Sequence, residues 1–154
     1  MTSYILAACG GFLLAVLWMD LMFDVQVLPH RQSSELPEGV LSSIAGYYRR
    51  VTTTARPMGH LVGAVMMVVL VTLAIQAAQH MRAWIAIVSF LLAGSAIGLG
   101  ILSAFPNAVR LGARSGTALE QSELARSICR VHIVCFAAML AFMALQLLVA
   151  AGVV

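Results

Sequence analysis

Charged side chains are scarce in this sequence, and lysine is absent. Only 10% of the 154 residues are charged, whereas about a quarter are charged in a typical soluble domain. Apolar residues make up 62%. This composition excludes an ordinary soluble domain and predicts a membrane protein with most of its length in lipid. The net charge of +3 comes from arginine alone, and we interpret it as a membrane-orientation signal, with no nucleic-acid partner.

Cysteine motifs are absent as well. Cys9, Cys129 and Cys135 lie singly in apolar runs, without a CxxC pair or the spacing of a disulfide framework. No internal repeat or low-complexity tract is visible, so we predict a single transmembrane domain over 1–154. The first apolar run has no basic stretch before it and no cleavage-like site after it, which predicts a retained helix rather than a signal peptide.

Four apolar segments are long enough to cross a bilayer, which takes about 20 residues. The second and third are joined by only "QHMR", which requires an antiparallel hairpin. The sequence therefore predicts an all-α, integral membrane four-helix transmembrane bundle. Its predicted spans cover approximately 4–28, 60–78, 83–104 and 128–149.

Arginine placement predicts the orientation of this bundle. Eight arginines lie in or beside the connections that follow the first and third spans, and only Arg82 lies on the opposite side. Arginine-rich connections usually stay in the cytoplasm. We therefore predict a multi-pass protein of a bacterial-type inner membrane, with long cytoplasmic loops and both termini outside. The eight arginines are Arg31, Arg49, Arg50, Arg56, Arg110, Arg114, Arg126 and Arg130.

The first long connection contains an amphipathic pattern. Apolar residues recur at helical spacing, with Pro37 suited to a first turn, and predict a short cytoplasmic interfacial helix over about 37–54. Tyr47 and Tyr48 are expected at the level of the lipid headgroups. Whether this helix anchors or caps the bundle, or forms a lid over a site, stays open.

Polar residues from all four spans fall in the predicted cytoplasmic leaflet. Ionisable groups in a bilayer are costly and usually face the bundle interior with partners. Asp20 and Asp24 share one face of the first span, one turn apart. The sequence therefore predicts one shared polar site, comprising Asp20, Asp24, His60, Asn107, Arg130 and His132.

Three functions are possible for this predicted site: metal binding, haem binding and proton transfer. The alternative is that its residues form ion pairs with a structural role alone. Asp20, Asp24, His60 and His132 are candidate ligands of a transition metal, although no HExxH-type motif is present. His60 and His132 are candidate ligands of a haem. Alternatively, Asp20 and His132 transfer protons without a cofactor, while Arg130 stabilises negative charge. The structural interpretation pairs the aspartates with Arg126 or Arg130.

Two small-residue motifs, Gly59-xxx-Gly63 and Gly94-xxx-Gly98, indicate close helix packing. We expect this packing within the chain in preference to a homodimer. A homodimer or a larger membrane complex remains open as a partner, besides membrane lipid.

The segments "ILSAFPNAVRLG" and "LARSICRVHIVCFAAML" resemble the anthrone-oxygenase-like family of small four-helix membrane proteins. Asn107 and His132 are the polar positions that match the family pattern, whereas Val134 stands where an arginine is expected. The resemblance implies oxidation of polycyclic phenolic substrates. We therefore predict an oxidoreductase-like membrane protein that acts on a lipid-soluble small molecule. The alternative is a non-catalytic haem-binding or accessory subunit of a larger membrane complex.

Overall fold

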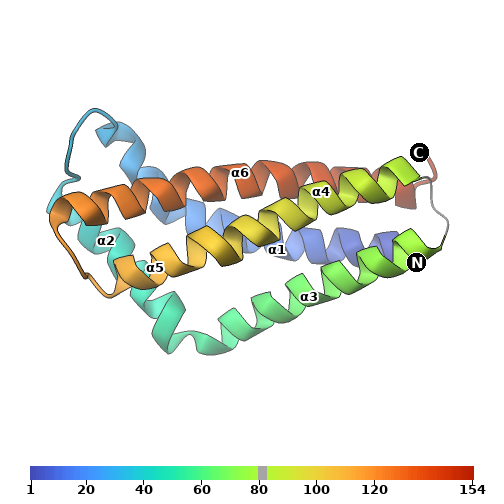
Figure 1. Ribbon diagram of the computed structural model, residues 1–154, viewed down its shortest axis with the longest axis horizontal. Helices are drawn as coiled ribbons and strands as arrows, with labels where there is room; N and C mark the ends of the chain where they lie inside the picture. Colours follow the sequence, from blue (N-terminus) through green and yellow to red (C-terminus); the bar gives the residue numbers. More distant parts are fainter. Residues whose placement is uncertain (80–82) are drawn as a thin grey trace.

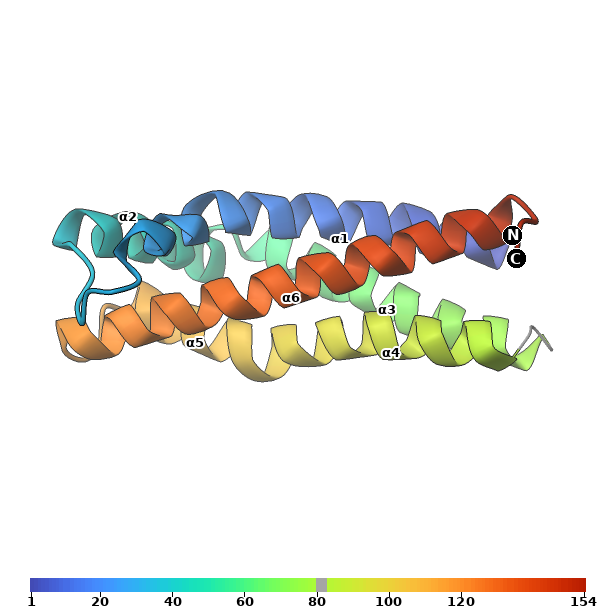
Figure 2. The same ribbon diagram turned by 90° about the horizontal axis from the view of Figure 1, so that it is seen from above.

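Four long apolar helices dominate the computed structural model, which describes residues 1–79 and 83–154, with Arg56 described by its backbone alone. The helices long and apolar enough to cross a membrane are Thr2–His30, Pro57–Ala78, Ala83–Gly112 and Ala118–Ala150. They run lengthwise beside one another (Figures 1 and 2). The predicted all-α four-helix bundle is confirmed, and the chain is a multi-pass membrane protein. His80 and Arg82, used in predicting the hairpin and orientation, lie outside the described residues.

Each long helix packs against two others. Helix α1 (Thr2–Asp24) contacts α6 (Ala118–Ala150) and α3 (Arg56–Ala78), while α4 (Ala83–Leu99) also contacts α6 and α3. Both chain termini lie at one end of the bundle, which we call the terminal end (Figure 2). The opposite end bears α2 (Glu38–Arg49) and α5 (Phe105–Gly112), and we call it the capped end (Figure 1).

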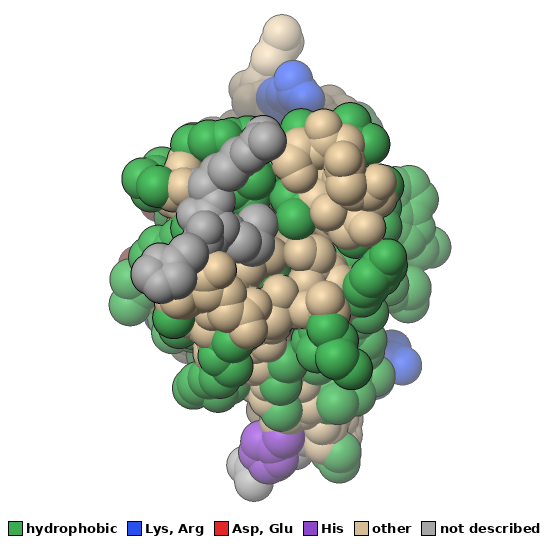
Figure 3. Space-filling model, turned by 90° about the vertical axis from the view of Figure 1, so that its right-hand side faces the viewer, with side chains coloured by type: hydrophobic (Ala, Val, Ile, Leu, Met, Phe, Trp, Pro, Cys, Tyr) green, Lys and Arg blue, Asp and Glu red, His purple; other side chains and the backbone are tan. Residues whose placement is uncertain are grey.

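The bundle buries apolar side chains in its interior and leaves others on its flanks. Leu6, Leu13, Val69 and Phe142 belong to the central core between the long helices. Many large apolar side chains point outward instead, and they line the flanks when the terminal end is viewed (Figure 3). Apolar flanks carry no penalty in hydrocarbon, so this distribution fits a protein surrounded by lipid.

Irregular turns continue the first and third spans past the ends of α1 and α4. Helix α1 continues as a 3₁₀ turn, η1 (Val25–His30), which contains Pro29. A π-helical turn, η3 (Gly100–Ala104), joins α4 to α5, and Pro106 follows near the start of α5. Because proline lacks an N–H and its ring clashes with the carbonyl four residues earlier, a widened turn before Pro106 is the expected accommodation.

Helix α6 begins well before the apolar run that predicts a fourth span from about 128. Thr117 caps it: the Thr117 Oγ1 accepts a hydrogen bond from the Glu120 amide, and the Glu120 carboxylate accepts one from the Thr117 amide. Such a reciprocal cap satisfies two backbone donors and fixes a helix start. The first turns of α6 are polar, so hydropathy alone places its beginning too late.

Helix α2 covers the capped end of the bundle. It buries Leu41, Ile44 and Tyr48 against an apolar cluster that includes Leu111 and Ile128. Only 2% of Tyr48 is exposed, so its ring packs inside the protein and does not contact lipid headgroups. A second π-helical turn, η2 (Arg50–Thr54), then leads into α3. The predicted helix over 37–54 thus consists of α2 and η2.

Two polar side chains of α6 hold the connection before α2. The Ser122 Oγ accepts a hydrogen bond of 2.9 Å from the Leu36 amide. The Arg126 guanidinium donates to the backbone oxygens of His30, Ser33 and Ser34, at 3.3, 2.6 and 3.0 Å. Arg126 is therefore engaged by the chain itself and is no partner of the aspartates.

The expected close packing of helices at the glycine motifs is wrong, because a Cβ built on Gly94 would meet the side chain of Phe90, which lies one turn earlier on the same helix. A Cβ built on Gly59, Gly63 or Gly98 would meet no described atom within 4 Å. Close approach occurs instead at Gly112, where α5 meets the end of α2. A Cβ at Gly112 would lie 2.8 Å from the backbone nitrogen of Arg49.

We expect Gly112→Ala to destabilise the protein in mild detergent, because the added methyl group collides with the α2 backbone rather than with a movable side chain. Overpacking of this kind costs roughly 1–3 kcal/mol. The matched control is Gly46→Ala on α2, where a Cβ meets nothing within 4 Å and alanine favours the helix. Thermal unfolding of both variants checks this, and equal melting temperatures would contradict the close approach.

Candidate functional site

A buried aspartate–histidine pair joins the first and last helices near the capped end. Asp24, at the end of α1, is completely buried, and its Oδ2 lies 2.6 Å from the Nδ1 of His132 on α6. Because an ionised carboxylate only accepts hydrogen bonds, the Nδ1 of His132 is the donor. This bond fixes the imidazole tautomer and leaves Nε2 as the second functional nitrogen of the ring.

Tyr48 of α2 supplies the second hydrogen bond to the Asp24 carboxylate. Its hydroxyl donates to Asp24 Oδ1 at 2.7 Å. Burial raises the pKa of the Tyr48 phenol well above its usual value, and the nearby Asp24 and Asp20 carboxylates raise it further. The phenol therefore stays protonated and remains a donor. Three helices, α1, α2 and α6, meet at this one carboxylate.

Asp20, one turn before Asp24 on α1, also accepts a hydrogen bond from a tyrosine of α2. Its Oδ1 accepts a hydrogen bond of 2.6 Å from the Tyr47 hydroxyl. The Tyr47 ring stacks on Phe23, with ring centroids 4.1 Å apart. Burial raises the pKa of the Tyr47 phenol, and Asp20 adds to this increase. Neighbouring positions on a helix point in different directions, which lets Tyr47 and Tyr48 reach separate carboxylates.

The Nε2 of His132 belongs to a side chain that is only 8% exposed. This nitrogen forms no hydrogen bond within residues 1–79 and 83–154. Over the same residues, the fully buried side-chain nitrogens and oxygens that lack a partner are Gln121 Oε1 and Arg126 Nε. His132 Nε2 is not among these atoms, so the described residues do not enclose it completely. An imidazole held by a carboxylate at Nδ1, with no hydrogen bond at Nε2, is suited to accept or donate a proton.

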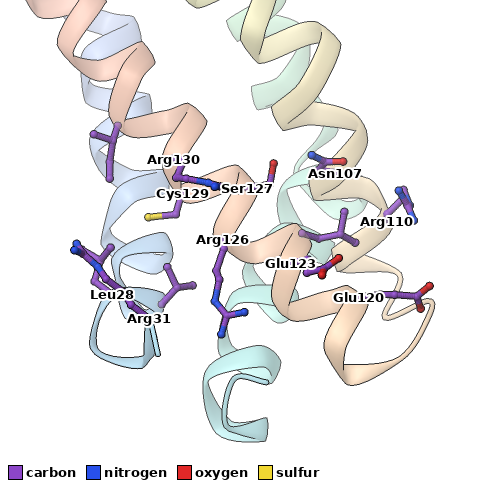
Figure 4. Close-up of a pocket in the computed structure, with 13 residues that line it drawn as sticks. Leu28, Arg31, Asn107, Arg110, Glu120, Glu123, Arg126, Ser127, Cys129 and Arg130 are labelled. Atoms are coloured by element: carbon purple, nitrogen blue, oxygen red, sulfur yellow. The ribbon is translucent and has the colours of Figure 1, made fainter. Parts of the chain in front are cut away.

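Two of the residues predicted in the same site lie elsewhere. Arg130 is exposed and, with Asn107, lines a groove of about 900 Å³ between the end of the first span, α5 and the outer face of α6 (Figure 4). Arg130 and His132 are two positions apart, which corresponds to about 200° around a helix. They therefore occupy nearly opposite faces of α6, so Arg130 and Asn107 are separate from the Asp24–His132 pair.

The aspartates have no arginine partner within the described part of the chain. There, the ion pairs are Asp24–His132 and the exposed Glu38–Arg114 pair. The interpretation that Arg126 or Arg130 pairs with Asp20 or Asp24 is therefore wrong. Tyrosine hydroxyls and an imidazole take that place.

His60 does not join the Asp24–His132 pair. It is exposed near the start of α3, and α3 packs against α1 and α4. Within the described ranges, no group of three or more His, Cys, Asp or Glu side chains is arranged to hold a metal ion. The expected metal site of Asp20, Asp24, His60 and His132 therefore finds no support, and neither does haem ligation by His60 and His132.

A second polar network, at the terminal end, was not expected from the sequence. The Gln76 Nε2 donates to Ser3 Oγ at 2.9 Å and to Gln146 Oε1 at 3.1 Å. The Gln146 Nε2 donates to Ser89 Oγ at 2.8 Å. These four buried residues belong to four different helices and supply hydrogen bonds that lipid cannot. The two buried glutamines therefore have a structural role, which is to link the helices by hydrogen bonds.

Comparison of the chain with protein-family models, with curated proteins and with solved structures gave no match. Membership of the anthrone-oxygenase-like family stays a prediction from the quoted segments.

We expect the folded protein to lose stability as the pH rises above about 10, the usual pKa of tyrosine. There the unfolded chain releases phenolic protons that the raised pKa of Tyr48 retains in the folded state. By linkage, this lowers the unfolding free energy by up to about 1.4 kcal/mol per pH unit for Tyr48. Denaturation midpoints measured in mild detergent at several pH values give the change of stability with pH.

The control is Tyr48→Phe, which removes the titrating phenol. This variant starts from a lower stability near neutral pH but loses less of it in alkali. No lysine titrates in this range to obscure the result. Equal alkaline slopes for the two proteins would contradict a buried Tyr48 phenol.

Proposed function

We propose that this membrane protein is an enzyme in which His132 exchanges a proton with a lipid-soluble substrate. The observation that carries the proposal is the 2.6 Å contact between His132 Nδ1 and the fully buried Asp24, which orients the ring and leaves Nε2 without a hydrogen bond within the described residues. A carboxylate at Nδ1 stabilises the imidazolium that forms when Nε2 accepts a proton.

The proposed step is a single proton transfer. The bond between oxygen and hydrogen in a substrate hydroxyl breaks, its proton passes to His132 Nε2, and the electron pair remains on the substrate oxygen. The imidazolium then carries its charge beside the Asp24 carboxylate, so the protein side of the reaction becomes a neutral ion pair. In a low-dielectric interior the attraction within this ion pair is stronger than in water.

The substrate class that we propose is a polycyclic phenol dissolved in the bilayer. The resemblance of "ILSAFPNAVRLG" and "LARSICRVHIVCFAAML" to an anthrone-oxygenase-like family suggests this class. The apolar surroundings of His132 support it, because Cys135 and Met139 continue the buried face of α6 along the bundle. Deprotonation is the step that would make such a phenol more reactive toward an oxidant, and the proposal extends only to this proton transfer.

Asp20 and the two tyrosines have supporting parts. Asp20, one turn from Asp24 and partly exposed, adds negative potential that favours the imidazolium. Tyr47 and Tyr48 hold the two carboxylates in position through their hydroxyls. We also propose that the capped end faces the cytoplasm of a bacterial-type inner membrane. The arginines that surround this end support the orientation.

We expect the protein in neutral-detergent micelles to convert bound β-naphthol, a lipid-soluble bicyclic phenol, into its naphtholate at neutral pH. The His132 imidazole is the base that accepts the proton. Ultraviolet difference spectra at excess protein measure the naphtholate. His132→Gln should reduce the signal to that of empty micelles, and Asp24→Asn should reduce it in part, because a neutral amide no longer stabilises the imidazolium.

His60→Gln is the matched control, since it makes the same chemical change at an exposed histidine outside the pair. It should behave like the unmodified protein. Circular dichroism of each variant confirms that the helices remain folded. The proposal is overturned if the unmodified protein matches empty micelles, or if the folded His132→Gln and His60→Gln variants give equal signals.

A further inference from the structure

The outer face of α6 carries a second site that the proton-transfer reaction does not use. The groove of about 900 Å³ is bounded by Leu28 and Arg31 on one side and by Asn107 and Arg110 on the other (Figure 4). Arg126, Ser127 and Arg130 of α6 form its floor between them. Three separate segments of the chain thus contribute an arginine to one concave surface.

Most of these guanidinium groups lack an acidic partner. Arg31, Arg110 and Arg130 are exposed, and none forms an ion pair within the part of the chain that the structure describes. The groove also contains Glu120 and Glu123, so four arginines face two carboxylates. The Glu120 carboxylate is engaged with Thr117 in the cap of α6. The groove therefore has an excess of positive charge with free N–H donors.

The fourth arginine of the groove, Arg126, is engaged by the chain itself. Its terminal nitrogens donate to backbone oxygens of the connection before α2, but its Nε is buried and has no partner among the described residues. A buried N–H without an acceptor is destabilising. Guanidinium groups bind phosphate oxygens well because their donors form a planar fork.

Apolar side chains line another part of the groove. Val27, Leu28, Leu124 and Ile133 line it, and Ile133 lies one turn further along α6 than Arg130, toward the middle of the span. A ligand that fits both parts has an anionic head at the arginines and a hydrocarbon chain that continues along α6 in the membrane. Basic pockets between spans at the cytoplasmic boundary commonly bind such lipid headgroups.

We propose that this groove binds the phosphodiester headgroup of an anionic phospholipid. Arg31, Arg110 and Arg130 contact the phosphate oxygens from three sides, and Ile133 lies against an acyl chain. Arg130 in the groove and His132 in the buried pair lie on nearly opposite faces of α6, so the lipid site does not include the proton-transfer pair.

The test is a thermal-unfolding titration of the whole chain in neutral detergent with dioleoyl phosphatidylglycerol. We expect saturable stabilisation. In Arg110→Gln/Arg130→Gln, the lipid concentration for half-maximal stabilisation should rise about thirtyfold, from the usual contribution of two basic residues near an anionic lipid. Arg49→Gln/Arg50→Gln is the control, because these two arginines are exposed at the same end but do not line the groove.

Two further titrations identify which part of the lipid is bound. Dioleoyl phosphatidylcholine, which has the same chains and no net charge, should stabilise the protein weakly and equally in all variants. Inorganic phosphate at the same concentration should have no effect. Equal stabilisation of both arginine variants by phosphatidylglycerol would overturn the site, and stabilisation by inorganic phosphate alone would overturn its assignment to a lipid.

Discussion

A carboxylate inside an apolar helix bundle must receive its hydrogen bonds from the protein, because lipid offers none. Asp24 meets this constraint with one bond from Tyr48 and one from His132. The constraint ties the end of α1 to α6 and to a helix that is not a membrane span at all. Removing one partner from such a buried pair typically costs about 3–5 kcal/mol, so the arrangement of the capped end depends on it.

The position of Tyr48 depends in turn on how α2 sits on α5. Gly112 allows the two backbones to approach at that point, and the π-helical turn η3 before Pro106 leads from α4 into α5. The connection before α2 is held by Ser122 and Arg126, from the same helix that carries His132. Features that appear unrelated in the sequence therefore serve one purpose, which is to bring a phenol to a buried carboxylate.

The fold was predictable because length and hydropathy identify helices that must lie in lipid. Depth was predictable too, since a known rise per residue places Asp20, Asp24 and His132 near one end. Direction around each helix axis was not predictable, which explains why Arg130 was wrongly grouped with His132. Tyr48 was missed because a tyrosine at a membrane surface and one in a buried network give the same amphipathic pattern. Gln76 and Gln146 were missed because single glutamines far apart in sequence carry no sign that they pair.

The most direct test is nitrogen NMR of histidine-labelled protein in lipid bilayers, with the His132 signals assigned by their loss in His132→Gln. The central claim is that the Nδ1 of His132 donates to Asp24. We predict a protonated Nδ1 with the signature of a strong hydrogen bond, which disappears in Asp24→Leu while the signals of the other histidines stay unchanged. A neutral ring protonated at Nε2 alone, with signals that do not respond to Asp24→Leu, would contradict it.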